Sequence, residues 1–168
     1  MPPVNNKQVI EAGIKKAEII KNKTVIAMLI YAADKAIGIV ASTKKHPYDN
    51  YTFNLEQSLA YAVYFGGRIV KMRANERNWS VANPEKYEPW GAYPLDRIHD
   101  DGADDAIRFL ESYSSESPFE IVIIAGAEYA INVEEHWEEE GDPIRVLWGA
   151  FTFLSMNTVK TAKKFKIK

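Results

Sequence analysis

The chain has 168 residues, of which 46% are hydrophobic and 26% charged, with a formal net charge of −2 and no cysteine. This length and balance predict a single globular domain over residues 1–168 and exclude wholesale disorder, and the lack of cysteine excludes disulfides, thiolate metal sites and cysteine nucleophiles. The charge is unevenly placed, because residues 85–142 hold 17 acidic and 3 basic side chains, and such an acidic block argues against tight wrapping of nucleic acid.

The first predicted element is a long helix within residues 1–46. Asn5 or Asn6 can cap it, and apolar side chains then recur at three- and four-residue spacing. These are Val9, Ile10, Ile14, Ala17 and Ile20, and the pattern continues through the polar Thr24 to Met28, Tyr31 and Ala32. If unbroken to Lys45, the helix would be about 60 Å long at about 1.5 Å per residue. A break near residues 22–24 is the alternative.

The longest apolar run, VIAMLIYAA at residues 25–33, reads as a buried core segment. It is shorter than the roughly 20 residues that a membrane-spanning helix requires. The start of the sequence, two prolines and a valine after Met1 followed by polar NNKQ, also lacks the basic and apolar regions of a signal peptide. We therefore expect neither a membrane partner nor export.

The stretch YTFNLEQSLAYAVYFGGRIVK, residues 51–71, predicts a β-hairpin. Its tyrosines and β-branched residues over 59–65 suit a pleated surface. Gly66 and Gly67 then supply the positive φ angles of a two-residue turn, and residues 68–73 return as the partner strand.

Residues 75–99 are rich in proline and aromatic side chains and predict a long loop. Loops of this length in compact domains are usually functional or disordered, and the aromatics favour an ordered arm that docks on a partner. Tryptophan and tyrosine are common at the centres of protein interfaces. The candidate subunit-interface residues are therefore Trp79, Trp90, Tyr93 and Trp148.

The C-terminal half predicts two further helices and a strand. A short helix begins near Asp100 and ends near residues 114–118. The apolar run FEIVIIAG at 119–126 predicts a central strand covered on both faces, and residues 127–136 could add an edge strand. Residues 146–164, inside a C-terminal extension at 143–168, predict the last helix. The expected fold is α+β: a small antiparallel sheet with a hairpin, backed by the long N-terminal helix and a second helix, plus a C-terminal helix.

One local cluster of side chains in the sequence is a candidate for catalytic or metal chemistry. Gly66 and Gly67 lack the spacing of phosphate-binding loops, and the three histidines lack metal-ligand spacing. The local cluster that could hold a cation is formed by Glu134, Glu135, His136 and Glu138–Glu140. Because charge runs are usually solvated faces, we expect no catalytic residue, cofactor or metal. A small metal-dependent or acid–base enzyme that uses His136 with Glu134, Glu135 or Glu138 remains the alternative.

Two motifs give the chain a family resemblance. HPYDNYTFNLEQSLAYAVYFGGRIV carries Pro47, Thr52, Asn54, Leu55 and Ser58, and IVIIAGAEYAINVEEH carries Tyr129, Ala130, Val133 and Glu134. In order and spacing the chain resembles the tail-completion or minor tail (neck) proteins of tailed bacteriophages. Members tend to have a long N-terminal helix, a Pro-gap-Thr-Gly-x-Leu-x-x-Ser-Ile motif, and a strand with a glycine turn. Phe53 stands in place of the usual glycine, Glu56 stands where a basic residue is common, and the 75–99 loop is enlarged.

The resemblance implies a structural virion protein and no enzyme. It implies a homo-oligomeric ring of six or twelve copies at the head–tail junction, contacting neck, portal or tail proteins. DNA would pass through the channel without sequence-specific binding. From the charge of the acidic run at 134–142, which would repel DNA, we expect Glu138, Glu139 and Glu140 to face this channel. Such a protein is assembled in the cytoplasm of the host bacterium and resides in the virion. A peptide-binding adaptor that uses the hairpin edge is a further alternative.

Overall fold

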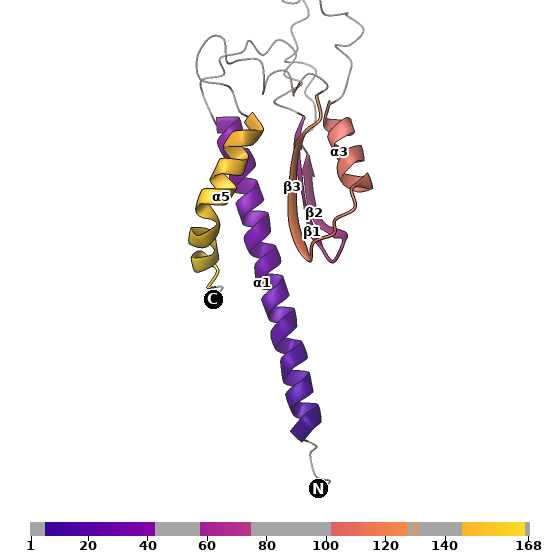
Figure 1. Ribbon diagram of the computed structural model, residues 1–168, viewed down its shortest axis with the longest axis vertical. Helices are drawn as coiled ribbons and strands as arrows, with labels where there is room; N and C mark the ends of the chain where they lie inside the picture. Colours follow the sequence, from indigo (N-terminus) through magenta and orange to yellow (C-terminus); the bar gives the residue numbers. More distant parts are fainter. Residues whose placement is uncertain (1–5, 43–57, 75–101, 128–129, 131–145, 167–168) are drawn as a thin grey trace, which may run out of the picture.

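The computed structural model describes residues 6–42, 58–74, 102–127, 130 and 146–166. Their elements are α1 (Asn6–Ser42), β1 (Leu59–Phe65), β2 (Arg68–Ala74), α3 (Gly102–Ser112), β3 (Phe119–Ala125) and α5 (Val146–Lys164), arranged as in Figure 1. Three helices and a small antiparallel sheet confirm the predicted α+β fold. The 75–99 loop and the strand suggested at 127–136 fall outside the described residues, apart from residues 127 and 130.

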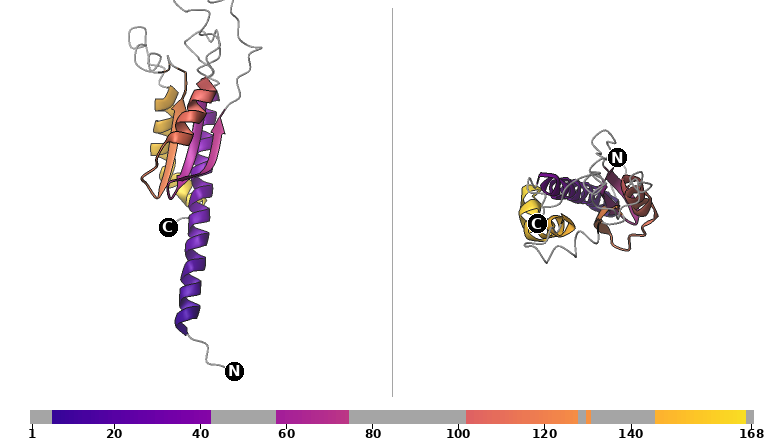
Figure 2. Two further views of the ribbon diagram at one scale, coloured as in Figure 1. Left: turned by 90° about the vertical axis from the view of Figure 1, so that its right-hand side faces the viewer. Right: turned by 90° about the horizontal axis from the view of Figure 1, so that it is seen from above.

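Helix α1 runs without a break for 37 residues, a length of about 55 Å. Residues 22–24 do not interrupt it, and the hydroxyl of Thr24 donates to the carbonyl of Ile20 at 2.8 Å within the helix. The C-terminal half of α1 lies against the sheet and α5, whereas the N-terminal half extends past both (Figures 1 and 2). We call residues 6–21 the N-terminal arm.

The described sheet has the order β2-β1-β3, and both pairings are antiparallel. The hairpin between β1 and β2 turns at Gly66 and Gly67, whose φ angles of 57° and 76° confirm the predicted two-residue turn. Non-glycine residues adopt such angles only with strain.

The sequence predicted that the apolar run at 119–126 forms the central strand, and this prediction is wrong for the described sheet. The central strand is β1, which is buried over Leu59–Tyr64, and β3 pairs with β1 only. The continuous apolar run of β3 has another cause, because helices contact the sheet on both of its faces. Coverage of two faces produces the same sequence pattern whether a strand lies at the centre or at an edge.

Strand β1 sends alternate side chains into two cores. On one face, the strand's odd-numbered residues meet α1 and α5 in a cluster of Ala33, Ala36, Ile37, Leu59, Tyr61, Val63 and Ala150. On the other face, Ala60, Ala62 and Tyr64 pack with Ala106 and Leu110 of α3. The sheet therefore lies between a layer of two helices and a layer of one (Figure 1).

The end of β3 and the start of α3 approach each other at two glycines. The amide of Gly126 donates to the carbonyl of Ser58 at 3.1 Å. A Cβ on Gly126 would lie 1.9 Å from the carbonyl oxygen of Gly102. The backbones can come this close because neither position carries a side chain.

Candidate interaction surfaces

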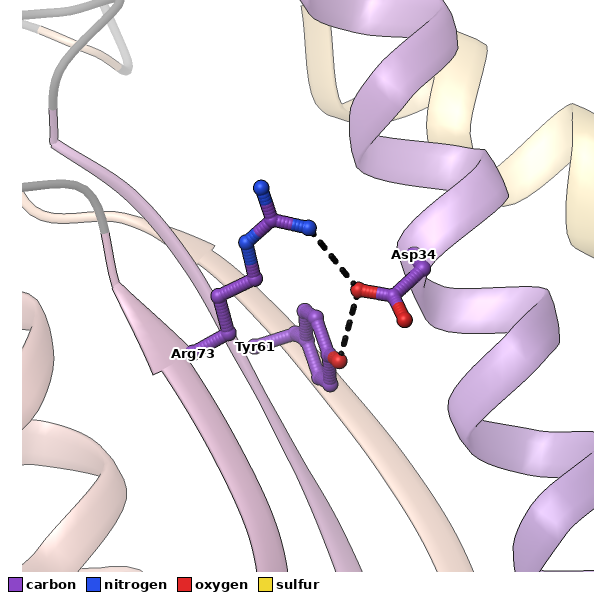
Figure 3. A network of polar contacts seen from close by, with 3 residues as sticks. All are labelled: Asp34, Tyr61 and Arg73. Atoms are coloured by element: carbon purple, nitrogen blue, oxygen red, sulfur yellow. Dashed lines mark hydrogen bonds and ion pairs between the residues drawn. The ribbon is translucent and has the colours of Figure 1, made fainter.

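A polar network fixes the orientation of α1 on the sheet. One carboxylate oxygen of Asp34 accepts a hydrogen bond from the hydroxyl of Tyr61 at 2.9 Å and an ion-paired hydrogen bond from Arg73 at 3.0 Å (Figure 3). Burial, and then the hydrogen bond to the Asp34 carboxylate, raises the pKa of Tyr61 to about 12. The side chains of Arg73 and Asp34 are 55% and 40% exposed, so their ion pair contributes at most about 1 kcal/mol. The network joins α1 to both strands of the hairpin.

A second group of hydrogen bonds ties the loop after α3 to β3, and α3 itself to β1. The carboxylate of Glu120 accepts from the hydroxyl of Tyr113 at 2.8 Å and from that of Ser115 at 2.6 Å. The hydrogen bond to Glu120 raises the pKa of Tyr113. The buried Tyr64 donates its hydroxyl to the carbonyl of Leu110 at 2.5 Å. These contacts position the loop that connects α3 to β3.

The outer side of α3 is an acidic face. Asp104, Asp105 and Glu111 are exposed there beside one cation, Arg108, which pairs with Asp105. Phe109 lies among them with 45% of its surface exposed. We call these five residues the acidic face.

The outer side of α5 is apolar and basic. Phe151, Met156 and Val159 are exposed by 58%, 77% and 68%, and Lys160 and Lys163 are exposed beside them. Helix α5 contains no acidic residue. We call these five residues the basic face, and Figure 1 shows that α5 and α3 lie on opposite sides of the sheet.

The structure brings the two resemblance motifs together, because the strands that carry them are neighbours. Ser58 is buried directly before β1, Leu59 pairs with Ala125, and Gly66 and Gly67 form the turn. Beyond β3, Ala130 is buried and its amide donates to the carbonyl of Ala127 at 2.9 Å.

The other predicted site residues are not placed by the described residues. The motif residues outside them are Pro47, Thr52, Asn54, Leu55, Tyr129, Val133 and Glu134. Trp79, Trp90, Tyr93, Glu135, His136 and Glu138–Glu140 also fall outside. Trp148 belongs to α5, but its side chain is not among those described. Within the described segments, no three His, Cys, Asp or Glu side chains are grouped closely enough to hold a metal ion.

Sequence reasoning missed the network of Asp34, Tyr61 and Arg73. Asp34 is 27 residues from Tyr61 and 39 from Arg73, so no local motif could connect them. The available signal was a single carboxylate inside the apolar stretch that follows residue 24. A charge in such a stretch usually has a partner.

No protein-family model, curated protein or solved structure matches the chain. None of the described helices has the length and apolarity needed to cross a membrane.

Proposed function

We propose that the protein is a structural virion component that forms a ring at the head–tail junction of a tailed bacteriophage. The observation that carries this proposal is the pair of opposed faces, acidic on α3 and basic on α5, on opposite sides of one sheet. The motifs around Ser58, Gly66 and Ala130, which resemble those of neck proteins, suggest where such a ring would reside.

A closed ring needs two different surfaces on each subunit, because each copy meets its neighbours head to tail. The acidic face of one copy and the basic face of the next have opposite charge, which sets the register of the contact. The exposed Phe109, Phe151 and Met156 would supply apolar area. Burial of a large apolar side chain contributes up to about 1.5 to 3 kcal/mol.

In this role the ring joins the portal side of the neck to the tail and surrounds the DNA channel. The acidic run around Glu138–Glu140 would face the channel and repel the phosphate backbone, so that DNA passes without binding. The partners are further copies of this chain and the neck, portal or tail proteins above and below.

Charge reversal on the two faces tests the ring. We expect native mass spectrometry and electron microscopy of the full chain to show closed rings. Glu111→Lys on the acidic face and Lys160→Glu on the basic face should each weaken assembly, and the double variant should restore it. Arg68→Glu, an exposed change at the hairpin turn, serves as the control. A chain that stays monomeric alone and beside neck proteins, or rings indifferent to both reversals, would contradict the proposal.

A peptide-binding adaptor is the second candidate, and β2 provides the observation that favours it. In the described sheet β2 pairs on one side only, and its Ile69 and Val70 are 37% and 40% exposed. An extended peptide could add as a further strand there. A monomer that captures an extended peptide, and loses it when Val70 is replaced by proline, would favour this function over the ring.

A further inference from the structure

The N-terminal arm of α1 carries an apolar stripe that no described residue covers. Val9, Ile10, Ile14 and Ile20 are exposed by 54% to 61%. With Gly13 and Ala17 they recur at three- and four-residue spacing, so they lie on one side of the helix. Soluble surfaces rarely leave such a contiguous row of large aliphatic side chains without a partner.

Lysines border the apolar stripe along both edges. At 3.6 residues per turn, Lys7 and Lys21 lie along one edge and Lys16 and Lys23 along the other. Glu11 and Glu18 fall farther round the helix. The charges nearest to any bound partner are therefore positive on both sides.

The stripe continues the line along which α5 already packs on α1. Tyr31 lies on the same side of α1 as the stripe, and its ring is 5.7 Å from that of Phe165, just past the end of α5. The ammonium of Lys164 lies 4.0 Å from the centre of the same ring. Beyond this point α1 continues with no described segment beside it (Figures 1 and 2). Helix α5 covers this side of α1 along its C-terminal half, and the apolar stripe lies on the same side of the N-terminal arm.

We propose that the N-terminal arm binds an amphipathic helix of another protein, with glutamate or aspartate along the edges of its apolar face. This helix would extend the line of α5. The proposal concerns a separate surface from the acidic and basic faces, and it holds whether or not the chain forms rings.

Three other occupants fit less well. Pairing of two arms would set lysines against lysines in either orientation, because both edges are basic. The acidic helix α3 of a second copy does not fit, since its apolar side, Ala106 and Leu110, is buried on the sheet. A flat anionic bilayer would meet α5 first, because α5 stands out from the same side of α1 by about one helix diameter, roughly 10 Å.

A synthetic peptide tests the proposal with the full-length protein. The probe is a labelled helix of about three heptads with leucine and isoleucine on one face and glutamate on both edges, and the control peptide has lysine on the edges. We expect fluorescence anisotropy to show binding of the glutamate peptide that weakens with salt, and at least about tenfold weaker binding of the lysine peptide.

Matched variants assign the binding to the stripe. Ile14→Asp should abolish it, whereas Gln8→Asp, which makes the same charge change on the opposite side of the arm, should leave it intact. The double variant Lys16→Glu/Lys21→Glu should reverse the preference and favour the lysine peptide. All of these positions are exposed, and circular dichroism and native mass spectrometry check that fold and oligomeric state are unchanged.

Four results would overturn the proposal. Equal binding of both peptides, or binding that survives Ile14→Asp, would remove the stripe or its lysines from recognition. Association with phosphatidylserine vesicles that depends on Ile14, without peptide binding, would identify a lipid surface as the occupant. Self-association that Ile14→Asp abolishes, again without peptide binding, would identify a second copy.

Discussion

Burial of Tyr61, together with its hydrogen bond to Asp34, makes the stability of the fold sensitive to alkaline pH at this residue. The pKa of Tyr61 is raised to about 12 in the folded protein, compared with about 10 in an unfolded chain. The folded state therefore holds this proton more tightly. Its contribution to stability is fully present below about pH 10 and is lost as the pH rises from about 10 to about 12.

We expect Tyr61→Phe to lower the free energy of unfolding by about 1 kcal/mol at neutral pH, because the hydrogen bond to Asp34 is lost. The variant should also lose less stability than the wild type between about pH 9 and about pH 11. Urea denaturation at neutral pH measures the first effect, and its repetition at about pH 9 and about pH 11 measures the second. Tyr64→Phe, whose hydroxyl bonds to the Leu110 carbonyl instead, is the comparison. An equal alkaline loss in the wild type and in Tyr61→Phe would show that Tyr61 does not govern this pH range.

Two glycines should respond in opposite ways to alanine. Gly126→Ala places a methyl group 1.9 Å from the Gly102 carbonyl oxygen and 2.6 Å from the Ala106 amide nitrogen, so it should destabilise the fold by about 3 kcal/mol or more. Gly149→Ala in α5 meets nothing within 4 Å and should stabilise it by about 0.5 to 1 kcal/mol. Thermal unfolding compares them. A Gly126→Ala variant as stable as wild type would mean that this junction is looser than its geometry implies.

At the residue scale, the sequence indicated local backbone features better than contacts between segments that lie far apart along the chain. Gly66 and Gly67 could be assigned positive φ because a two-residue turn requires it. The close approach of Gly126 to Gly102 and the partners of Asp34 could not, since each joins segments more than 20 residues apart. Such contacts depend on which face of the sheet each helix covers, and periodicity does not contain that information.

At the scale of elements, the residue pattern was sufficient to predict the type and length of the helices and strands. The spacing from Val9 to Ala32 predicted one long helix, and the predicted last helix has the bounds of α5, Val146–Lys164. Strand order was not recoverable, because β1 alternates small and aromatic residues although it is central, whereas β3 is uniformly apolar at an edge. The small residues of β1, Ala60 and Ala62, leave room for α3 to approach.

Helix α1 should show two levels of stability along one continuous element. Residues 33, 36 and 37 are buried against the sheet, whereas the N-terminal arm is exposed throughout. Isolated helices of this length are marginal in water, so amides in residues 9–20 should exchange with deuterium far faster than those in 29–37. Hydrogen exchange with mass spectrometry measures this. Equal protection of both halves would indicate that a partner already covers the arm in the purified protein.

At the scale of the whole molecule, charge is sorted by side. The acidic face lies on α3, and the basic face and the lysine-bordered arm belong to the other helical layer. The sequence already showed this sorting, since residues 85–142 are acidic while the two ends of the chain are basic. Only the fold shows that the helices carrying these charges, α3 and α5, lie on opposite sides of the sheet.

If copies assemble through these two faces, assembly should weaken as salt rises. Exposed charges are screened over about 10 Å at 0.1 M ionic strength and about 3 Å at 1 M. Sedimentation velocity across this range should show rings giving way to smaller species, while circular dichroism stays constant. Rings that persist unchanged at high salt would mean that Phe109, Phe151 and Met156, and not the charges, hold the contact.

The unbroken course of α1 also has a mechanical consequence. From Asn6 to Asp34 the continuous helix is about 42 Å long, with its far end beyond the sheet. A sideways force on that end of the helix is transmitted along α1. It loads the contact where Tyr61 and Arg73 hydrogen-bond Asp34. A partner that binds the N-terminal end of α1 can thereby tilt the helix and deform the β1–β2 hairpin, which it does not touch.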